Sequence, residues 1–163
     1  MDLPEEILIV LYSVVSDHCL PISDLCATIY IVEQIVGIKN IDVYEVTSIG
    51  PIAPNFQSSL EVLEALGLIR IRDGLATLSE KGLTVVRQIL VDPARKKERE
   101  FYEISRRLIN EFYEEILTIC YYLWLAKKGG AQIPERIKAI ILALHREQPQ
   151  KVEDRVIIPS VDK

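Results

Sequence analysis

The stretch that decides the fold is Gly50 to Gly82, GPIAPNFQSSLEVLEALGLIRIRDGLATLSEKG. Within it, Asp73-Gly74 supplies the two positive-φ residues that a two-residue type I′ hairpin turn requires. With this turn, the expected strand pairs are Arg72–Leu75, Ile71–Ala76, Arg70–Thr77 and Ile69–Leu78. Alternation then turns one set of side chains inward, Ile69, Ile71, Ala76 and Leu78, and leaves Arg70, Arg72, Leu75 and Thr77 outside. The sequence therefore predicts a hairpin with two arginines on its solvent face.

Helices are predicted on both sides of this hairpin. The segment from Pro54 to Leu66 has apolar residues at helical spacing, and Gly67 stands where a left-handed C-cap belongs. Ser79 is placed to cap a second helix, whose apolar stripe is Leu83, Val86, Ile89 and Leu90. The order helix, hairpin, helix is typical of a winged helix-turn-helix.

Two further helices are predicted before this core, over Pro4–Cys19 and Ser23–Val36, with Pro21 enforcing the break between them. The segment 42–46 alternates in polarity, which predicts the third strand of the winged helix. His18 lies on the apolar side of the first helix. We therefore expect a packed core histidine rather than a base or a ligand.

The residues quoted above also carry a family resemblance. A Tyr44-Glu45-Val46 strand before Gly50-Pro51, Leu60 and Leu63 on a helix, Gly67-Leu68-Ile69 and Leu78-Ser79-Glu80-Lys81-Gly82 together resemble the YwgA-like and Panacea-domain proteins. PadR-type and other winged-helix regulators share the last part. The similarity spans 7–89. It implies a small intracellular regulator or antitoxin-like adaptor and brings no catalytic residues.

The second half of the chain predicts one long helix. From Asp92-Pro93 to Lys128 the helical pattern runs without a breaker for about 35 residues. Its last third, 116–126, is apolar on every side, and such a helix must be covered on every side. We therefore expect a homodimer, with an interface formed by Ile116, Ile119, Cys120, Leu123 and Trp124. The alternative is an intramolecular bundle in which the helix breaks near Arg106 and folds back.

The predicted fold class is thus mainly α, a winged helix-turn-helix with a long C-terminal helical dimerisation arm. The domains expected are a winged helix over 1–91 and a dimerisation unit over 92–147, which ends in a helix over Pro134–Glu147. The tail over 148–163 is either loose or a clamp on a partner subunit.

Composition narrows the class of protein. The chain has 163 residues, 49% hydrophobic and 26% charged, which predicts one compact core. Its acidic start precedes a short apolar run that cannot span a bilayer, so we expect a cytoplasmic protein with no membrane contact. The abundance of Ile, Glu, Lys and Arg hints at a thermophile. Cys19, Cys26 and Cys120 form no CxxC pair and are expected to be buried thiols, with a Cys19–Cys26 disulfide left open. No metal or cofactor is expected.

Two classes of partner compete, DNA and protein. Polar side chains suited to bases and phosphates lie on the helix 54–66: Asn55, Gln57, Ser58 and Ser59. Cations suited to phosphates lie on the hairpin and at the start of the long helix: Arg70, Arg72, Arg95, Lys96, Lys97 and Arg99. Against DNA stand Glu61 and Glu64 on that helix, and a net charge of −5.

The interpretation that follows is a dimeric winged-helix DNA-binding protein, a transcription regulator. The alternative is a protein-interaction module, such as an adaptor, an antitoxin-like protein or a subunit of a larger assembly. An enzyme is not expected, because the chain has only two histidines and neither a phosphate loop nor a nucleophile arrangement at meaningful spacing. Cations that share one face would favour DNA, whereas a face split by Glu61 and Glu64 would favour protein.

Overall fold

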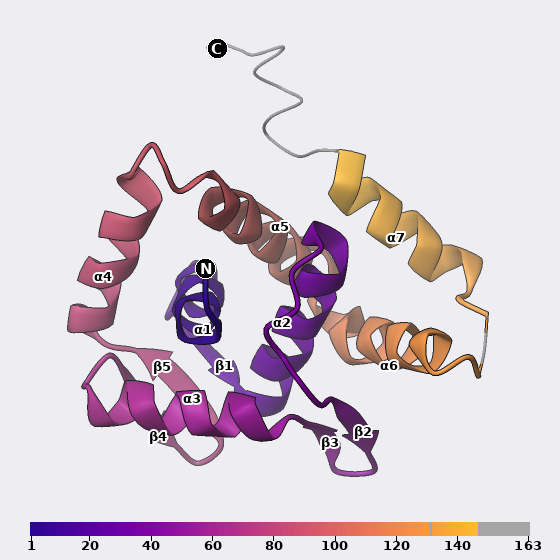
Figure 1. Ribbon diagram of the computed structural model, residues 1–163, viewed down its shortest axis with the longest axis horizontal. Helices are drawn as coiled ribbons and strands as arrows, with labels where there is room; N and C mark the ends of the chain where they lie inside the picture. Colours follow the sequence, from indigo (N-terminus) through magenta and orange to yellow (C-terminus); the bar gives the residue numbers. More distant parts are fainter. Residues whose placement is uncertain (131, 147–163) are drawn as a thin grey trace.

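The computed structural model describes residues 1–130 and 132–146, and this part of the chain is mainly helical with small antiparallel sheets (Figure 1). The elements in chain order are α1 (Leu3–Tyr12), β1 (Cys19–Pro21), α2 (Ile22–Val36), β2 (Glu45–Thr47), β3 (Gly50–Ile52), α3 (Pro54–Ala65), β4 (Ile69–Arg72), β5 (Leu75–Leu78), α4 (Glu80–Val91), α5 (Lys96–Phe112), a 3₁₀ turn (Tyr113–Glu115), α6 (Ile116–Lys127) and α7 (Glu135–Arg146). None of the described helices is long and apolar enough to cross a bilayer. The predicted tail over 148–163 lies outside the described residues.

Helix α2 lies at the centre of the molecule, packed against α1, α5 and α6 (Figure 1). Its residues 25–33 are all buried, and Gly37, with φ at +81°, ends it. Side chains from α1 to α7 belong to one continuous core. Because α5 packs across both α1 and α2, the predicted boundary at residue 91 does not separate two cores.

The predicted hairpin is confirmed residue by residue. Strands β4 and β5 pair in the expected register, with Asp73 and Gly74 both at positive φ, +52° and +76°. Helix α3 begins at Pro54, and Gly67 follows it in the left-handed region. Ser79 caps α4 as expected, since its Oγ accepts a hydrogen bond from the Gly82 amide at 3.0 Å. Local chemistry is sufficient to specify this part of the fold.

The predicted third strand is wrong. Residues 19–21 form β1, which pairs with β5 and gives the sheet order β1-β5-β4. The segment predicted for that role contributes only to β2, which pairs with β3 in a separate hairpin. The first helix also stops at Tyr12 rather than Cys19, because the chain turns back at 13–18 to place β1 beside β5. The backbone of His18 joins this pairing, its carbonyl accepting from the Leu78 amide at 3.0 Å.

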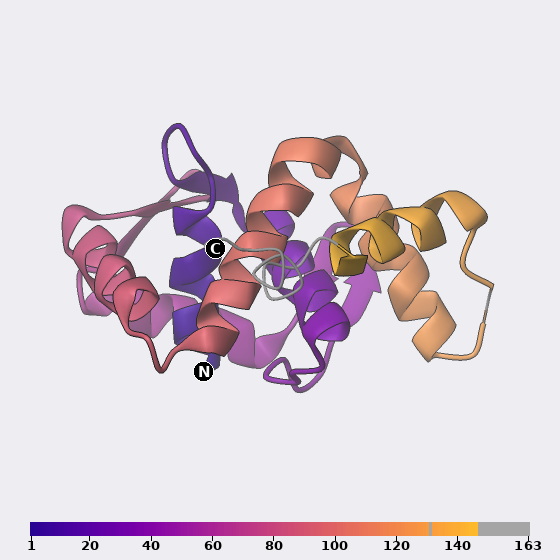
Figure 2. The same ribbon diagram turned by 90° about the horizontal axis from the view of Figure 1, so that it is seen from above.

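The single long helix is also wrong, because the chain breaks at Phe112. Its backbone leaves the helical region, with φ −134° and ψ +26°, and the 3₁₀ turn follows. Figure 2 shows α5 and α6 as two arms of a chevron. The bend is further along than the Arg106 of the alternative interpretation. It turns the apolar residues of α6 back onto α2, which offsets the lost helical geometry by burial.

Candidate functional site

The surface formed by α3 and the β4–β5 hairpin, here called the α3–wing face, holds few of the predicted base contacts. Gln57 and Ser58 are exposed on α3, whereas Ser59 is half-buried. Asn55 serves the fold, because its Nδ2 donates to the Asn40 carbonyl at 2.6 Å and its Oδ1 accepts from the Asp42 amide at 3.4 Å. Two of the four predicted polar residues are therefore free of the interior.

The rest of the exposed surface of α3 is acidic and apolar. Val62 on α3 and Leu66 at its C-cap are 53% and 54% exposed, and Glu61, the residue before Val62, is exposed as well. Glu64 Oε2 accepts from the Ile71 amide at 3.2 Å, which ties the helix to β4. No Lys or Arg lies on α3 itself, and the exposed Lys81 donates from Nζ to the Leu66 carbonyl at the C-terminal end of this helix at 3.0 Å.

The two predicted wing cations are where the register places them. Arg70 and Arg72 are both exposed on β4, next to α3. Leu75, opposite Arg72 on β5, is also exposed. The α3–wing face therefore combines two arginines with apolar side chains and the carboxylates of α3.

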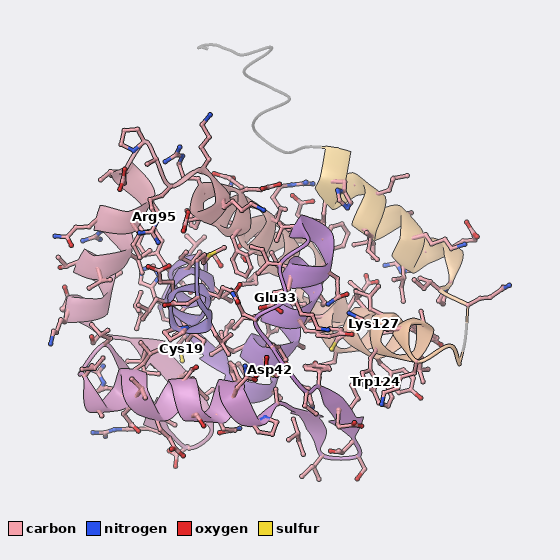
Figure 3. All side chains as sticks on the ribbon, viewed as in Figure 1. Cys19, Glu33, Asp42, Arg95, Trp124 and Lys127 are labelled. Atoms are coloured by element: carbon pink, nitrogen blue, oxygen red, sulfur yellow. The ribbon has the colours of Figure 1, made fainter. Side chains whose placement is uncertain are left out.

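The predicted cations at the start of α5 do not join this face. Helix α4 leads away from the β4–β5 hairpin, and the chain turns into α5 at the far end of α4 (Figure 1). The 12 residues of α4 give it a length of about 18 Å at 1.5 Å per residue. Arg95, labelled in Figure 3, pairs with Glu5 at 2.7 Å and Glu98 at 2.9 Å. Arg99 donates to the Pro93 carbonyl at 3.1 Å. Of this group, Lys96 and Lys97 are the exposed members.

Three of the five predicted dimer residues are not at the surface. Ile116, Ile119 and Cys120 are buried in the chain's own core against α2, and Leu123 and Trp124 are half-buried. The chevron at Phe112 is the reason, since it lets α2 cover this side of α6. The face of α6 that remains accessible contains Leu117 and Tyr121, each nearly half exposed.

A buried carboxylate pair escaped the sequence analysis. Glu6 on α1 and Glu33 on α2 are 0% and 1% exposed and share a hydrogen bond. Asn40 holds both, its Nδ2 donating to Glu6 Oε2 at 2.8 Å and its backbone amide to Glu33 Oε2 at 3.2 Å. The Ile41 amide donates to Glu33 Oε1 at 3.3 Å. Glu33 interrupts the largely apolar YIVEQIV, a signal that could have indicated it, whereas Glu6 follows Glu5 in the first turn of α1, where acidic residues are common.

The two carboxyl groups share one proton, so that the buried pair carries one negative charge rather than two. Burial, followed by the hydrogen bond and repulsion from Glu33, raises the pKa of Glu6 from 4.5 to about 10. Burial also raises the pKa of Glu33, against the lowering effect of the hydrogen bonds from Glu6 and two backbone amides. Glu6 therefore carries the proton and donates a hydrogen bond to Glu33, whose carboxylate accepts hydrogen bonds from Glu6 and from the Asn40 and Ile41 amides.

A second unpredicted feature is a cleft of about 190 Å³ beside α6. Its lining comes from α2, the segment 39–44 and the end of α6: Tyr30, Gln34, Lys39, Ile41, Asp42, Tyr44, Trp124, Lys127 and Lys128. Asp42, Trp124 and Lys127 are labelled around it in Figure 3. Aromatic and cationic side chains therefore gather at one concave place, although they are far apart in the sequence.

The three cysteines form no disulfide, and His18 stacks on a tyrosine. All three cysteines are free thiols; Cys26 and Cys120 are buried, whereas Cys19 is half-buried. Burial raises the pKa of Cys120 to about 12, which keeps this thiol neutral. His18 is half-buried and stacks on Tyr12, with ring centroids 5.4 Å apart. Among the described residues, no group of three or more His, Cys, Asp or Glu could hold a metal ion.

No family model, curated protein or solved structure matches this chain. The resemblance to YwgA-like, Panacea-domain and PadR-type proteins stays a prediction.

Proposed function

We propose that this chain is a winged-helix module that binds a partner protein through its α3–wing face. The order of elements supports the winged-helix arrangement: a helix, a short strand, two more helices and then a hairpin whose second strand pairs with the first strand. In this arrangement α3 takes the place of the recognition helix, and β4–β5 takes the place of the wing.

The composition of the face supports a protein partner. The observation that carries the proposal is that Val62 on α3 and Leu66 at its C-cap are both more than half exposed, on a helix that contains two glutamates and no Lys or Arg. Apolar side chains gain little from a nucleic-acid backbone, and carboxylates are repelled by phosphates. A complementary partner would present apolar side chains flanked by Lys or Arg, as an amphipathic basic helix does.

DNA binding is the second candidate, favoured by Arg70 and Arg72 on the wing and by Gln57 and Ser58 on α3. The geometry around α2 weakens it. In a DNA-bound helix-turn-helix the first helix crosses the phosphate backbone, but α2 is covered by α1, α5 and α6. The link from α2 to α3, over 37–53, contains the β2–β3 hairpin in place of a turn of about three or four residues.

The proposed module also forms a homodimer, through the face of α6 that α2 leaves accessible. Leu117 and Tyr121 on this face are exposed and apolar or aromatic, and Leu142 on α7 is exposed as well. Exposed apolar and aromatic side chains of this size are typical of interfaces between subunits.

Two double variants separate the partners. Val62→Ser with Leu66→Ser removes the apolar part of the face, and Arg70→Ala with Arg72→Ala removes the wing cations. All four residues are exposed, so both variants are expected to fold. The immobilised parent protein should capture a partner from an extract of its own cells. The apolar double variant should lose that partner, and neither protein should retain mixed duplex DNA at low salt.

The opposite result would establish DNA as the partner. In that case the parent protein would retain duplex DNA at low salt, and Arg70→Ala with Arg72→Ala would weaken this binding. The slope of log affinity against log salt concentration would fall by about one per lost phosphate contact. Capture that is unaffected by Val62→Ser with Leu66→Ser would also contradict the proposed face.

A further inference from the structure

The cleft beside α6 has a rigid aromatic wall. Tyr30 and Tyr44 stack with ring centroids 4.0 Å apart and an interplanar angle of 10°. Trp124 is held in place because its Nε1 donates to the Tyr44 carbonyl at 2.9 Å. Tyr44 is itself anchored by a hydrogen bond between its hydroxyl and Cys120 Sγ. The wall is therefore organised before any ligand arrives, which lowers the entropic cost of binding.

The mouth of this cleft is positively charged although the chain carries a net charge of −5. Lys39, Lys127 and Lys128 line it, and Asp42 is the carboxylate among the lining residues. Lys127 Nζ makes a long contact, 3.4 Å, with Gln34 Oε1, and its charge also acts on the buried Glu33.

Lys128 Nζ is 5.3 Å from the centroid of the Trp124 ring. It is also 3.5 Å from Glu45 Oε2, in an ion pair that is half exposed on both sides. Such an exposed pair is weak. An incoming anion can therefore bind the ammonium groups of Lys127 and Lys128 without breaking a strong ion pair.

We propose that the cleft binds a small aromatic carboxylate with a single ring. Its volume of about 190 Å³ is below the roughly 300–1,000 Å³ of pockets for drug-sized ligands. It exceeds the engineered cavity of about 150 Å³ that takes up benzene. The ring lies against Trp124, which is partly exposed whereas Tyr30 and Tyr44 are buried, and the carboxylate accepts hydrogen bonds from Lys127 and Lys128. A planar ring with one anionic group meets both requirements of the site.

The sole tryptophan of the chain is Trp124, so its fluorescence reports on the cleft directly. We expect benzoate and 4-hydroxybenzoate to change this fluorescence saturably and to give a matching heat of binding in calorimetry. Benzamide, which keeps the ring without the charge, should bind at least about tenfold more weakly. Cyclohexanecarboxylate, which keeps the charge without the aromatic ring, should also bind more weakly.

A matched pair of double variants tests the role of the cations. Lys127→Gln with Lys128→Gln should weaken benzoate binding about tenfold, since two charge-assisted hydrogen bonds are lost. Lys96→Gln with Lys97→Gln removes two adjacent exposed lysines at the start of α5 and should leave binding unchanged. Either of two results overturns the proposal: no saturable binding of either acid to the parent protein, or equal binding of benzoate and benzamide.

Discussion

Replacing Glu6 by glutamine tests the shared proton between α1 and α2. Glutamine keeps the shape of the protonated glutamate, so its Oε1 can accept from Asn40 and its Nε2 can donate to Glu33. The variant therefore preserves the hydrogen bonds of the buried pair and removes only the titration. Its stability should differ from that of the parent in a way that depends on pH.

The magnitude follows from the pKa of Glu6, which rises from 4.5 in the unfolded chain to about 10 in the fold. A raised pKa means that the folded state holds a proton that the unfolded chain releases. The stabilisation linked to this proton is complete below about pH 4.5 and falls by about 1.4 kcal/mol per pH unit up to about pH 10. At pH 7 the parent is thus penalised by on the order of 3 kcal/mol relative to Glu6→Gln.

Urea unfolding followed by the helical circular dichroism signal measures this difference. The free energy of unfolding is compared for the two proteins at several values between about pH 5 and pH 8. The gap between them should widen in favour of Glu6→Gln as the pH rises. Glu61→Gln on the exposed face of α3 is the matched control, and its curve should run parallel to that of the parent.

Parallel curves for Glu6→Gln and the parent over this range would refute the reasoning. They would mean that Glu6 does not take up a proton on folding. A variant that is less stable at every pH would likewise show that glutamine cannot replace a protonated glutamate beside Glu33.

Two further changes test the packing and the assembly. Gly82→Ala should lower stability by about 1–3 kcal/mol in thermal unfolding, because its Cβ would lie 2.3 Å from the Leu68 carbonyl oxygen. Its control is Gly130→Ala, whose Cβ meets an ordinary contact at 3.7 Å and which should melt at the temperature of the parent. Equal melting temperatures of the two variants would contradict the close approach at Gly82. Leu117→Ser with Tyr121→Ser should convert a dimer into a monomer in sedimentation velocity, and a parent protein that sediments as a monomer throughout the micromolar range would end the dimer proposal.

The hairpin and its flanking helices could be predicted because short-range chemistry specifies them. Asp73-Gly74 at positive φ, the left-handed Gly67 and the Ser79 cap each act within a few residues. These signals do not depend on what the rest of the chain does. The register of β4 and β5 followed from them and was correct at all four pairs.

Tertiary packing decides the parts that the sequence analysis missed. Strand β1 has three residues, too few for alternation to be recognised, and only its pairing with β5 makes it a strand. The break at Phe112 occurs without glycine or proline, because burying Ile116 and Ile119 on α2 outweighs a continuous helix. The buried pair and the cleft bring together residues from distant segments, and a local sequence pattern does not show which segments come into contact.

The two hydrogen bonds of the Asn55 side chain have a wider consequence. They join the first turn of α3 to the backbone of Asn40 and Asp42. The same short segment supplies Asp42 to the cleft and the Asn40 amide to Glu33. A partner that binds at the α3–wing face and shifts the start of α3 therefore shifts the Asp42 side of the cleft as well. Linkage then makes the effect reciprocal: a cleft ligand that changes affinity at α3 by some factor has its own affinity changed by that same factor.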